Sequence, residues 1–134
     1  MTTQVSDQLI NNHIEIDFGD LHPYGVAIGD VQSNNGWGIP YPFKNLPSPS
    51  DERVSFLWRG YISVYRLNSD GRLILEKYEY PNLGGKREPD IVNEIMDGDF
   101  YLIMKTEFRG LRTYIPFKSG QIVSNPDEWI VESE

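Results

Sequence analysis

The chain has 134 residues, of which 39% are hydrophobic and 13% aromatic, so it has the apolar content of a folded domain rather than of a disordered chain. Its 12 Lys and Arg residues against 20 Asp and Glu residues give a net charge of -8, which disfavours nucleic acid and anionic membranes as partners. Because the chain has no cysteine, disulfides, thiolate zinc sites and thiol nucleophiles are excluded.

The content of turn-forming residues indicates how the chain is organised into domains. With 12 glycines and 9 prolines, the composition indicates many turns rather than long helices. We therefore predict one β-rich domain over residues 1–134, with residues 1–8 and 132–134 frayed. The first residues, MTTQVSDQLI, lack the basic and apolar regions of a secretory signal, and no apolar run is long enough to span a membrane. We expect a soluble, cytoplasmic protein.

The first predicted elements form a hairpin. Residues 14–18, with the sequence IEIDF, alternate apolar and acidic side chains, which predicts a strand with one solvent-exposed face. Residues 24–28 are its predicted antiparallel partner, and residues 21–23 form the turn between them.

The next segment, residues 33–50, has neither strand alternation nor helical periodicity: SNNGWGIPYPFKNLPSPS. Its prolines exclude a helix and disfavour a central strand, because each one lacks a backbone donor. Its rings, Trp37, Tyr41 and Phe43, support two interpretations. They either cap one end of the core or form an anchor that is presented to a partner.

The strongest strand pattern covers residues 54–67, VSFLWRGYISVYRL. Its even positions are predicted to face the core, and its odd positions to be partly covered or partly exposed. The turn NSDG at residues 68–71 predicts a hairpin, because glycine accepts the left-handed conformation at its end. This turn sets a register that we state as expected pairs: Leu67 with Leu73, Tyr65 with Leu75, Ile62 with Tyr78, and Gly60 with Tyr80.

The second half of the chain begins with a predicted short helix over residues 89–96, where Pro89 suits the first helical position and Ile91 and Ile95 share a face. Strands are predicted at 99–108, 112–117, 121–123 and 129–131. The fold class is therefore mainly β: a single-domain antiparallel barrel or two-layer β domain with one short helix. The predicted core consists of Phe56, Trp58, Ile62, Val64, Leu73, Leu75, Phe100, Leu102, Met104 and Ile115.

Catalytic motifs are absent from the sequence. The two histidines, His13 and His22, lie in no recognised pattern. Asp17, Asp20 and His22 are close enough in sequence to suggest a metal cluster, but the same residues are favoured in a turn for hydrogen bonding alone. We therefore predict no catalytic residue, no metal and no cofactor, and leave open a hydrolase with a carboxylate and histidine site outside known motifs.

Three arginines lie beside aromatic residues. Arg59 belongs to the sequence WRGY, and Arg109 and Arg112 belong to FRGLRTY, which echoes it. Such arginines make cation–π contacts or grip a carboxylate, and the alternative is an internal ion pair with one of the many acidic residues. Together with the three rings of residues 33–50, these arginines are our candidate partner-binding residues.

The sequence WRGYI at residues 58–62, followed by DGRLIL at 70–75, resembles a pattern in small uncharacterised bacterial proteins, in which a W-R-G-Y strand precedes a D-G-x-L-x-L hairpin. The resemblance implies a bacterial, soluble, single-domain protein with an accessory or immunity role beside a toxin gene. It implies no catalytic residue, because the shared pattern is that of a structural hairpin.

Taken together, these features predict a non-catalytic module that binds a basic partner protein, because the acidic surface favours encounter with a cationic one. The alternatives are a small-molecule-binding β-barrel and a self-associating structural protein that forms a homodimer.

Overall fold

The computed structural model describes residues 6–29, 39–47, 61–81, 88–106 and 111–133, whose strands form two sheets. The first sheet has the order β1-β4-β5-β6, with β1 Gln8–Asn11, β4 Ile62–Leu67, β5 Leu73–Glu79 and β6 Asp90–Ile95. The second sheet has the order β10-β8-β7-β2-β3, with β9 paired to β8. Its strands are β2 Leu21–Ile28, β3 Ile39–Pro40, β7 Phe100–Thr106, β8 Leu111–Lys118, β9 Gln121–Ile122 and β10 Ile130–Ser133.

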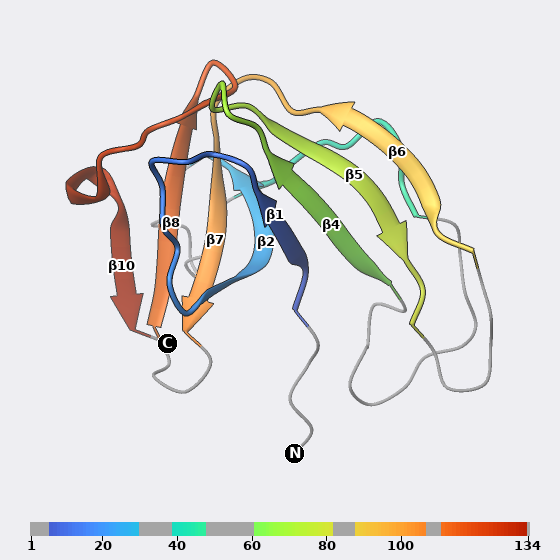
Figure 1. Cartoon of the computed structure of the whole chain (residues 1–134), viewed down its shortest axis with the longest axis horizontal. Helices are drawn as coiled ribbons and strands as arrows, with labels where there is room; N and C mark the ends of the chain where they lie inside the picture. Colours follow the sequence, from blue (N-terminus) through green and yellow to red (C-terminus); the bar gives the residue numbers. More distant parts are fainter. Residues whose placement is uncertain (1–5, 30–38, 48–60, 82–87, 107–110, 134) are drawn as a thin grey trace.

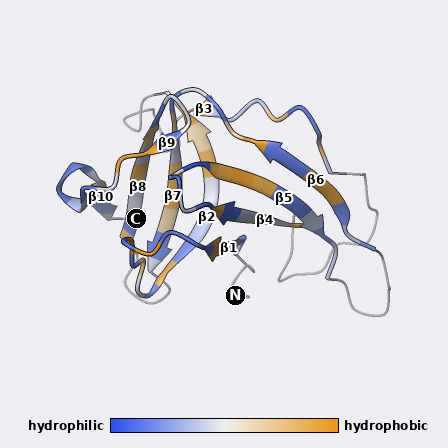
Figure 2. Cartoon of the chain, turned by 45° about the horizontal axis from the view of Figure 1, so that its top comes forward, coloured by the Kyte–Doolittle hydropathy of each residue, from blue (hydrophilic) through white to orange (hydrophobic). Residues whose placement is uncertain are grey.

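The two sheets form two layers that adjoin at one end and diverge toward the other (Figure 1). Apolar residues run along the middle of the first sheet in β5 and along β7 and β8 in the second (Figure 2). The mainly β prediction is therefore confirmed in its two-layer form, because the described strands do not close into a barrel. No described residues form a helix with the length and hydrophobicity needed to cross a membrane.

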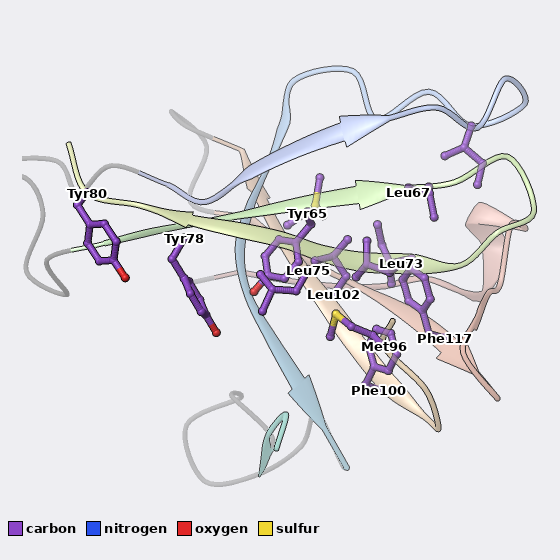
Figure 3. Packing of buried hydrophobic residues seen from close by; sticks show 13 residues of the cluster. Tyr65, Leu67, Leu73, Leu75, Tyr78, Tyr80, Met96, Phe100, Leu102 and Phe117 are labelled. Atoms are coloured by element: carbon purple, nitrogen blue, oxygen red, sulfur yellow. The ribbon is translucent and has the colours of Figure 1, made fainter. Parts of the chain in front are cut away.

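The core lies between the inner faces of the sheets (Figure 3). Phe100 and Phe117, from neighbouring strands β7 and β8, stack with ring centroids 4.7 Å apart. All predicted core residues that the structure describes are buried: Ile62, Val64, Leu73, Leu75, Phe100, Leu102, Met104 and Ile115. Phe56 and Trp58 lie outside the described residues.

A set of backbone hydrogen bonds between turns joins the two sheets at one end; we call this junction the corner. The N–H of Ile122 in β9 donates to the carbonyl oxygen of Gly71 in the β4–β5 turn at 2.9 Å. The N–H of Gly120 in the β8–β9 turn donates to the carbonyl oxygen of Gly98 at 2.8 Å. Chain segments far apart in the sequence are thus held together by backbone groups, which fixes how the sheets meet.

The β4–β5 hairpin follows the predicted turn. Gly71 has a φ of 88°, and its N–H donates to the carbonyl oxygen of Asn68 at 3.0 Å. The expected pairs next to the turn, Leu67 with Leu73 and Tyr65 with Leu75, are both confirmed.

Farther from the turn, the predicted register is wrong by one residue. Ile62 lies opposite Glu79 and not opposite Tyr78. The reason is a bulge beside Val64 and Tyr65, which inserts one extra residue into β5. The pair of Gly60 with Tyr80 lies outside the described residues.

The predicted strand at residues 14–18 is wrong. Ile14 is 95% exposed, and the side-chain amide of Asn11 donates to the carbonyl oxygen of Ile16 at 2.7 Å. These side-chain contacts hold a turn in place of a strand. The predicted turn at 21–23 instead begins β2, whose partner is β7.

The strand that precedes this turn is β1, and it pairs with β4 in parallel. The other described strand pairs are antiparallel. Asp7 is buried, Gln8 begins β1, and Glu132 and Ser133 end β10, so residues expected to fray at both ends take part in the fold.

The predicted helix at 89–96 is also wrong, because residues Asp90–Ile95 form strand β6. Ile91 and Ile95 are 66% and 60% exposed, whereas Glu94 between them points inward and is buried. The β-branched residues favour a strand, and pairing with β5 supplies backbone partners that an isolated short helix lacks.

The remaining strand predictions are confirmed within the described residues. Strands β7, β8, β9 and β10 overlap the four predicted segments, and residues 107–110 lie outside the described part. The turn at Ser119 and Gly120, with φ values of 51° and 76°, has both residues in the left-handed region that tight hairpins require. The short 3-10 helix Pro126–Glu128 leads into β10.

The corner predicts a difference between two glycine substitutions. A Cβ on Gly120 would lie 2.9 Å from Arg72 Nη1 and 3.1 Å from the carbonyl oxygen of Met96, whereas one on Gly98 would meet nothing within 4 Å. Both glycines have positive φ, so Gly98→Ala should cost about 1–2 kcal/mol from backbone strain alone. Gly120→Ala should cost at least about 1 kcal/mol more, because its methyl group also crowds the corner.

Urea unfolding of both variants measures this difference in the free energy of unfolding. Equal losses in the two variants would contradict close packing at the corner.

Candidate functional site

The candidate site is a depression of about 260 Å³ between the first half of β4 and the middle of β2; we call it the inter-sheet depression. It is lined by Asp7, Tyr24, Gly25, Val26, Ala27, Pro40, Phe43, Tyr61, Ser63, Tyr65 and Ile103. Among the described residues of this lining, Asp7 is the only charged one, and none is basic.

Burial separates a deep part of the depression from its rim. Asp7, Ser63 and Tyr65 are buried, whereas Phe43 and Tyr61 are half-buried and Pro40 is exposed. Asp7, Ser63 and Tyr65 therefore lie deep, and Phe43 and Tyr61 lie nearer the solvent.

Asp7 is positioned by the parallel pairing of β1 with β4. Because Gln8 lies opposite Val64, the preceding residue, Asp7, lies beside Ser63. The N–H of Ser63 donates to Asp7 Oδ1 at 3.0 Å, and Asp7 is only 4% exposed. A carboxylate at such depth needs hydrogen bonds to offset its lost hydration, and the Ser63 amide supplies one of them.

One side of the depression is formed by the chain that follows β3, residues 41–47, which we call the bridging segment. It runs from the edge of the second sheet to the edge strand β6 of the first. The N–H groups of Lys44 and Asn45 donate to Glu94 Oε1 at 3.0 Å and 3.3 Å. Glu94 is 8% exposed, so an inward-pointing carboxylate of β6 anchors the bridging segment.

The two described rings of the bridging segment contact the core. The N–H of Asp97 donates to the hydroxyl oxygen of Tyr41 at 3.0 Å, and the Tyr41 ring packs edge-on against Phe100 at 5.3 Å. The ring centroid of Phe43 lies 4.9 Å from that of Tyr41, and Phe43 also lines the depression. This is the arrangement of the capping interpretation, with Phe43 at the rim. Trp37 lies outside the described residues.

Tyrosines at the end of β5 support the bridging segment (Figure 3). The hydroxyl of Tyr78 donates to the carbonyl oxygen of Asn45 at 2.8 Å, and the Tyr80 hydroxyl donates to Asp90. Burial raises the pKa of Tyr78 well above its usual value, and the neighbouring Tyr61 and Glu94 raise it further. The Tyr61 ring packs edge-on against Tyr78 at 5.4 Å, so the rim of the depression continues into this cluster.

Arg112 is the candidate arginine that the structure describes, and it does not join this group. Arg112 in β8 has its Cζ 5.6 Å from the centre of the Tyr24 ring, and Lys105 Nζ lies 4.6 Å from the same ring. Arg112 therefore makes a cation–π contact on the second sheet and does not line the depression. Arg59 and Arg109 lie outside the described residues.

A second, larger depression of about 520 Å³ includes Asp17 and His22, two members of the suggested metal cluster. Asp20 is not part of its lining, and Asp17 Oδ1 accepts a hydrogen bond from the N–H of Gly19 at 2.9 Å. Within the described ranges, no three His, Asp or Glu side chains are grouped to hold a metal ion. Asp7 lines this depression as well as the inter-sheet depression.

Sequence reasoning missed the buried acidic residues of the site. Tyr61 and Ser63 lie on the face of the 54–67 strand that was predicted to be partly covered. The alternation of side chains in this segment therefore indicated their partial burial. Asp7 and Glu94 carried no such signal, because one lies at a predicted frayed end and the other in a predicted helix.

Comparison with protein-family models, curated proteins and solved structures finds no match to the chain. The inter-sheet depression and the charge of the chain are therefore the basis for the proposed function.

The Tyr78 hydroxyl predicts both a stability loss and a pH dependence. Tyr78→Phe should lower the free energy of unfolding at pH 7 by about 0.5–1.5 kcal/mol, because the bond to Asn45 is lost. Above about pH 10, the usual tyrosine pKa, unfolded wild-type protein releases a proton that the folded state retains, so wild-type stability falls. The difference in free energy of unfolding between wild type and Tyr78→Phe should therefore become smaller as the pH rises above about 10.

Urea unfolding of both proteins between about pH 8 and pH 11 measures this gap. A gap that stays constant over the range would contradict the raised pKa of Tyr78.

Proposed function

We propose that the protein is a non-catalytic binding module whose partner is a protein with a basic surface. The observation that carries this proposal is the inter-sheet depression, in which the described lining combines aromatic residues with one buried carboxylate and includes no basic side chain. Concave sites with mainly apolar lining and a few placed polar groups are typical of binding sites.

The charge of the chain supports the same partner. A net charge of -8 attracts a cationic protein over a distance and speeds the encounter with it. It also repels the phosphate backbone of nucleic acids, so protein is the class of macromolecule that this surface favours.

The lining of the depression supports binding over catalysis. Its described residues include neither histidine nor lysine, the groups that most often move protons or attack substrates near neutral pH. The Asp7 carboxylate is buried and accepts the N–H of Ser63.

Self-association is the competing function, and one observation favours it. Strand β6 is the outermost described strand of the first sheet, and its residues Ile91 and Ile95 are largely exposed. An exposed edge strand with apolar side chains is suited to pair with a second copy.

Light scattering combined with affinity capture tests the proposal. The purified protein should be a monomer, and a protein it captures from lysate should be basic and, once purified, should bind it in a stopped-flow measurement. The association rate constant should fall roughly tenfold or more as salt is raised, because salt screens the attraction.

The contrary results are equally specific. A constitutive dimer that captures nothing would support self-association through β6. An acidic partner with a salt-independent association rate would contradict the proposed basic partner.

A further inference from the structure

We infer that the basic partner packs an apolar part of its surface against one edge of the first sheet, on Ile74, Ile91, Ile95 and Leu46. We call these residues the β6 surface, because each belongs to β6 or lies beside it. The inference rests on the proposed function, since it names a contact surface for the same partner. It also goes beyond that function, because none of these residues lines the inter-sheet depression.

The strand register places three isoleucines on the outer face of the first sheet. Ile74 in β5 lies directly opposite Ile95 in β6. Val92 packs against the core and Glu94 is buried, so their neighbours Ile91 and Ile95 point away from the core. Both of these isoleucines are largely exposed, and Ile74 is half-buried.

Leu46 extends this apolar surface to the bridging segment. Glu94 Oε1 accepts the N–H groups of Lys44 and Asn45, so the chain that leads into Leu46 is held beside β6 (Figure 1). The Leu46 side chain is 75% exposed. Exposed apolar side chains that gather in one place are typical of an interaction surface. This one adjoins the segment that borders the depression.

The shape of β6 opposes edge pairing with a second copy. The register of β5 and β6 shifts between Leu75 and Lys77, where β6 has one extra residue. Asn93, at this bulge, has a φ of 51°. A bulge bends an edge strand and interrupts its regular row of backbone groups, which opposes the addition of another strand. The side chains of β6, rather than its backbone, therefore supply the contact.

The charge of the chain selects a basic occupant for the β6 surface. The net charge of -8 repels a second copy and attracts a cationic protein. Exposed carboxylates lie near both ends of β6, since Glu88 precedes the strand and Asp97 follows it. Protein interfaces commonly have an apolar centre and a polar rim, and acidic residues at the rim complement lysine and arginine on the partner.

An NMR titration with three short peptides tests the inference. The peptides are acetylated and amidated, and they alternate Lys with Leu, Lys with Ser, or Glu with Leu. The Lys-Leu peptide should shift the amide resonances of Ile74, Ile95 and Leu46. The Lys-Ser peptide should bind more weakly, because it lacks apolar side chains, and the Glu-Leu peptide should leave these resonances unchanged.

Contrary outcomes of the titration are specific. Equal shifts with the Lys-Ser peptide would show attraction by charge alone, and equal shifts with the Glu-Leu peptide would show that charge plays no part. Either result would overturn the inference, as would Lys-Leu shifts that are confined to other surfaces.

Two double variants sharpen this test. Replacing Ile91 and Ile95 by Thr keeps β-branched side chains but removes apolar area, so the dissociation constant for the Lys-Leu peptide should rise roughly tenfold. Replacing Ile39 and Val131 by Thr is the matched control, because these side chains are 60% and 59% exposed on strands of the second sheet. The control should leave the constant unchanged, and equal effects of the two double variants would contradict the β6 surface. If the first double variant does not fold, the three peptides decide on the wild-type protein alone.

The outcomes separate the inference from the proposed function. If a basic partner protein binds the wild type and the Ile91→Thr, Ile95→Thr variant equally well, the function stands and the β6 surface is wrong. If the Lys-Leu peptide binds on the β6 surface but no basic protein binds, the surface stands and the proposed function is wrong. A wild-type dimer that becomes a monomer in this variant would assign the surface to a second copy and overturn the inference.

Discussion

The arrangement of the two sheets depends on the corner, where β9 donates a backbone hydrogen bond to the β4–β5 turn and the β8–β9 turn donates one to Gly98, between β6 and β7. Gly71 and Gly120 make this contact possible, since both have positive φ and both lie too close to neighbouring atoms for a Cβ to fit without displacement. A junction at one end leaves the sheets free to diverge at the other (Figure 1). The large apolar core fills the closed end, and Tyr78 and Tyr80 extend it toward the open end (Figure 3).

The diverging end is occupied by polar groups in ordered positions. Glu94 from the edge strand β6 and Tyr78 from β5 hold the bridging segment, and Asp7 is held by the backbone of Ser63. Each of these groups is buried or nearly so, and each has hydrogen bonds that offset the loss of water. The inter-sheet depression therefore combines an ordered carboxylate with an aromatic rim.

Local signals predicted the hairpins well and the longer-range pairing poorly. The NSDG turn correctly predicted the residues that lie opposite Leu73 and Leu75, because the turn type fixes the register of the residues next to it. Beyond the bulge, the observed register of β4 and β5 differs from the predicted one by one residue, and no local sequence pattern indicates the extra residue in β5. Ile91 and Ile95 have helical spacing, yet their segment forms strand β6, because it pairs with the otherwise unpaired edge of β5. Asp7 became a site residue only through parallel pairing with a strand more than fifty residues later, a contact that no single-sequence pattern reveals.

The most direct test of the corner is native-state hydrogen exchange of the Ile122 and Gly120 amides, which donate to Gly71 and Gly98. Because these bonds join the two sheets, both amides should exchange only when the whole domain unfolds, like those of the central strands β7 and β8. Exchange of both amides much faster than global unfolding would contradict a corner that holds the sheets together.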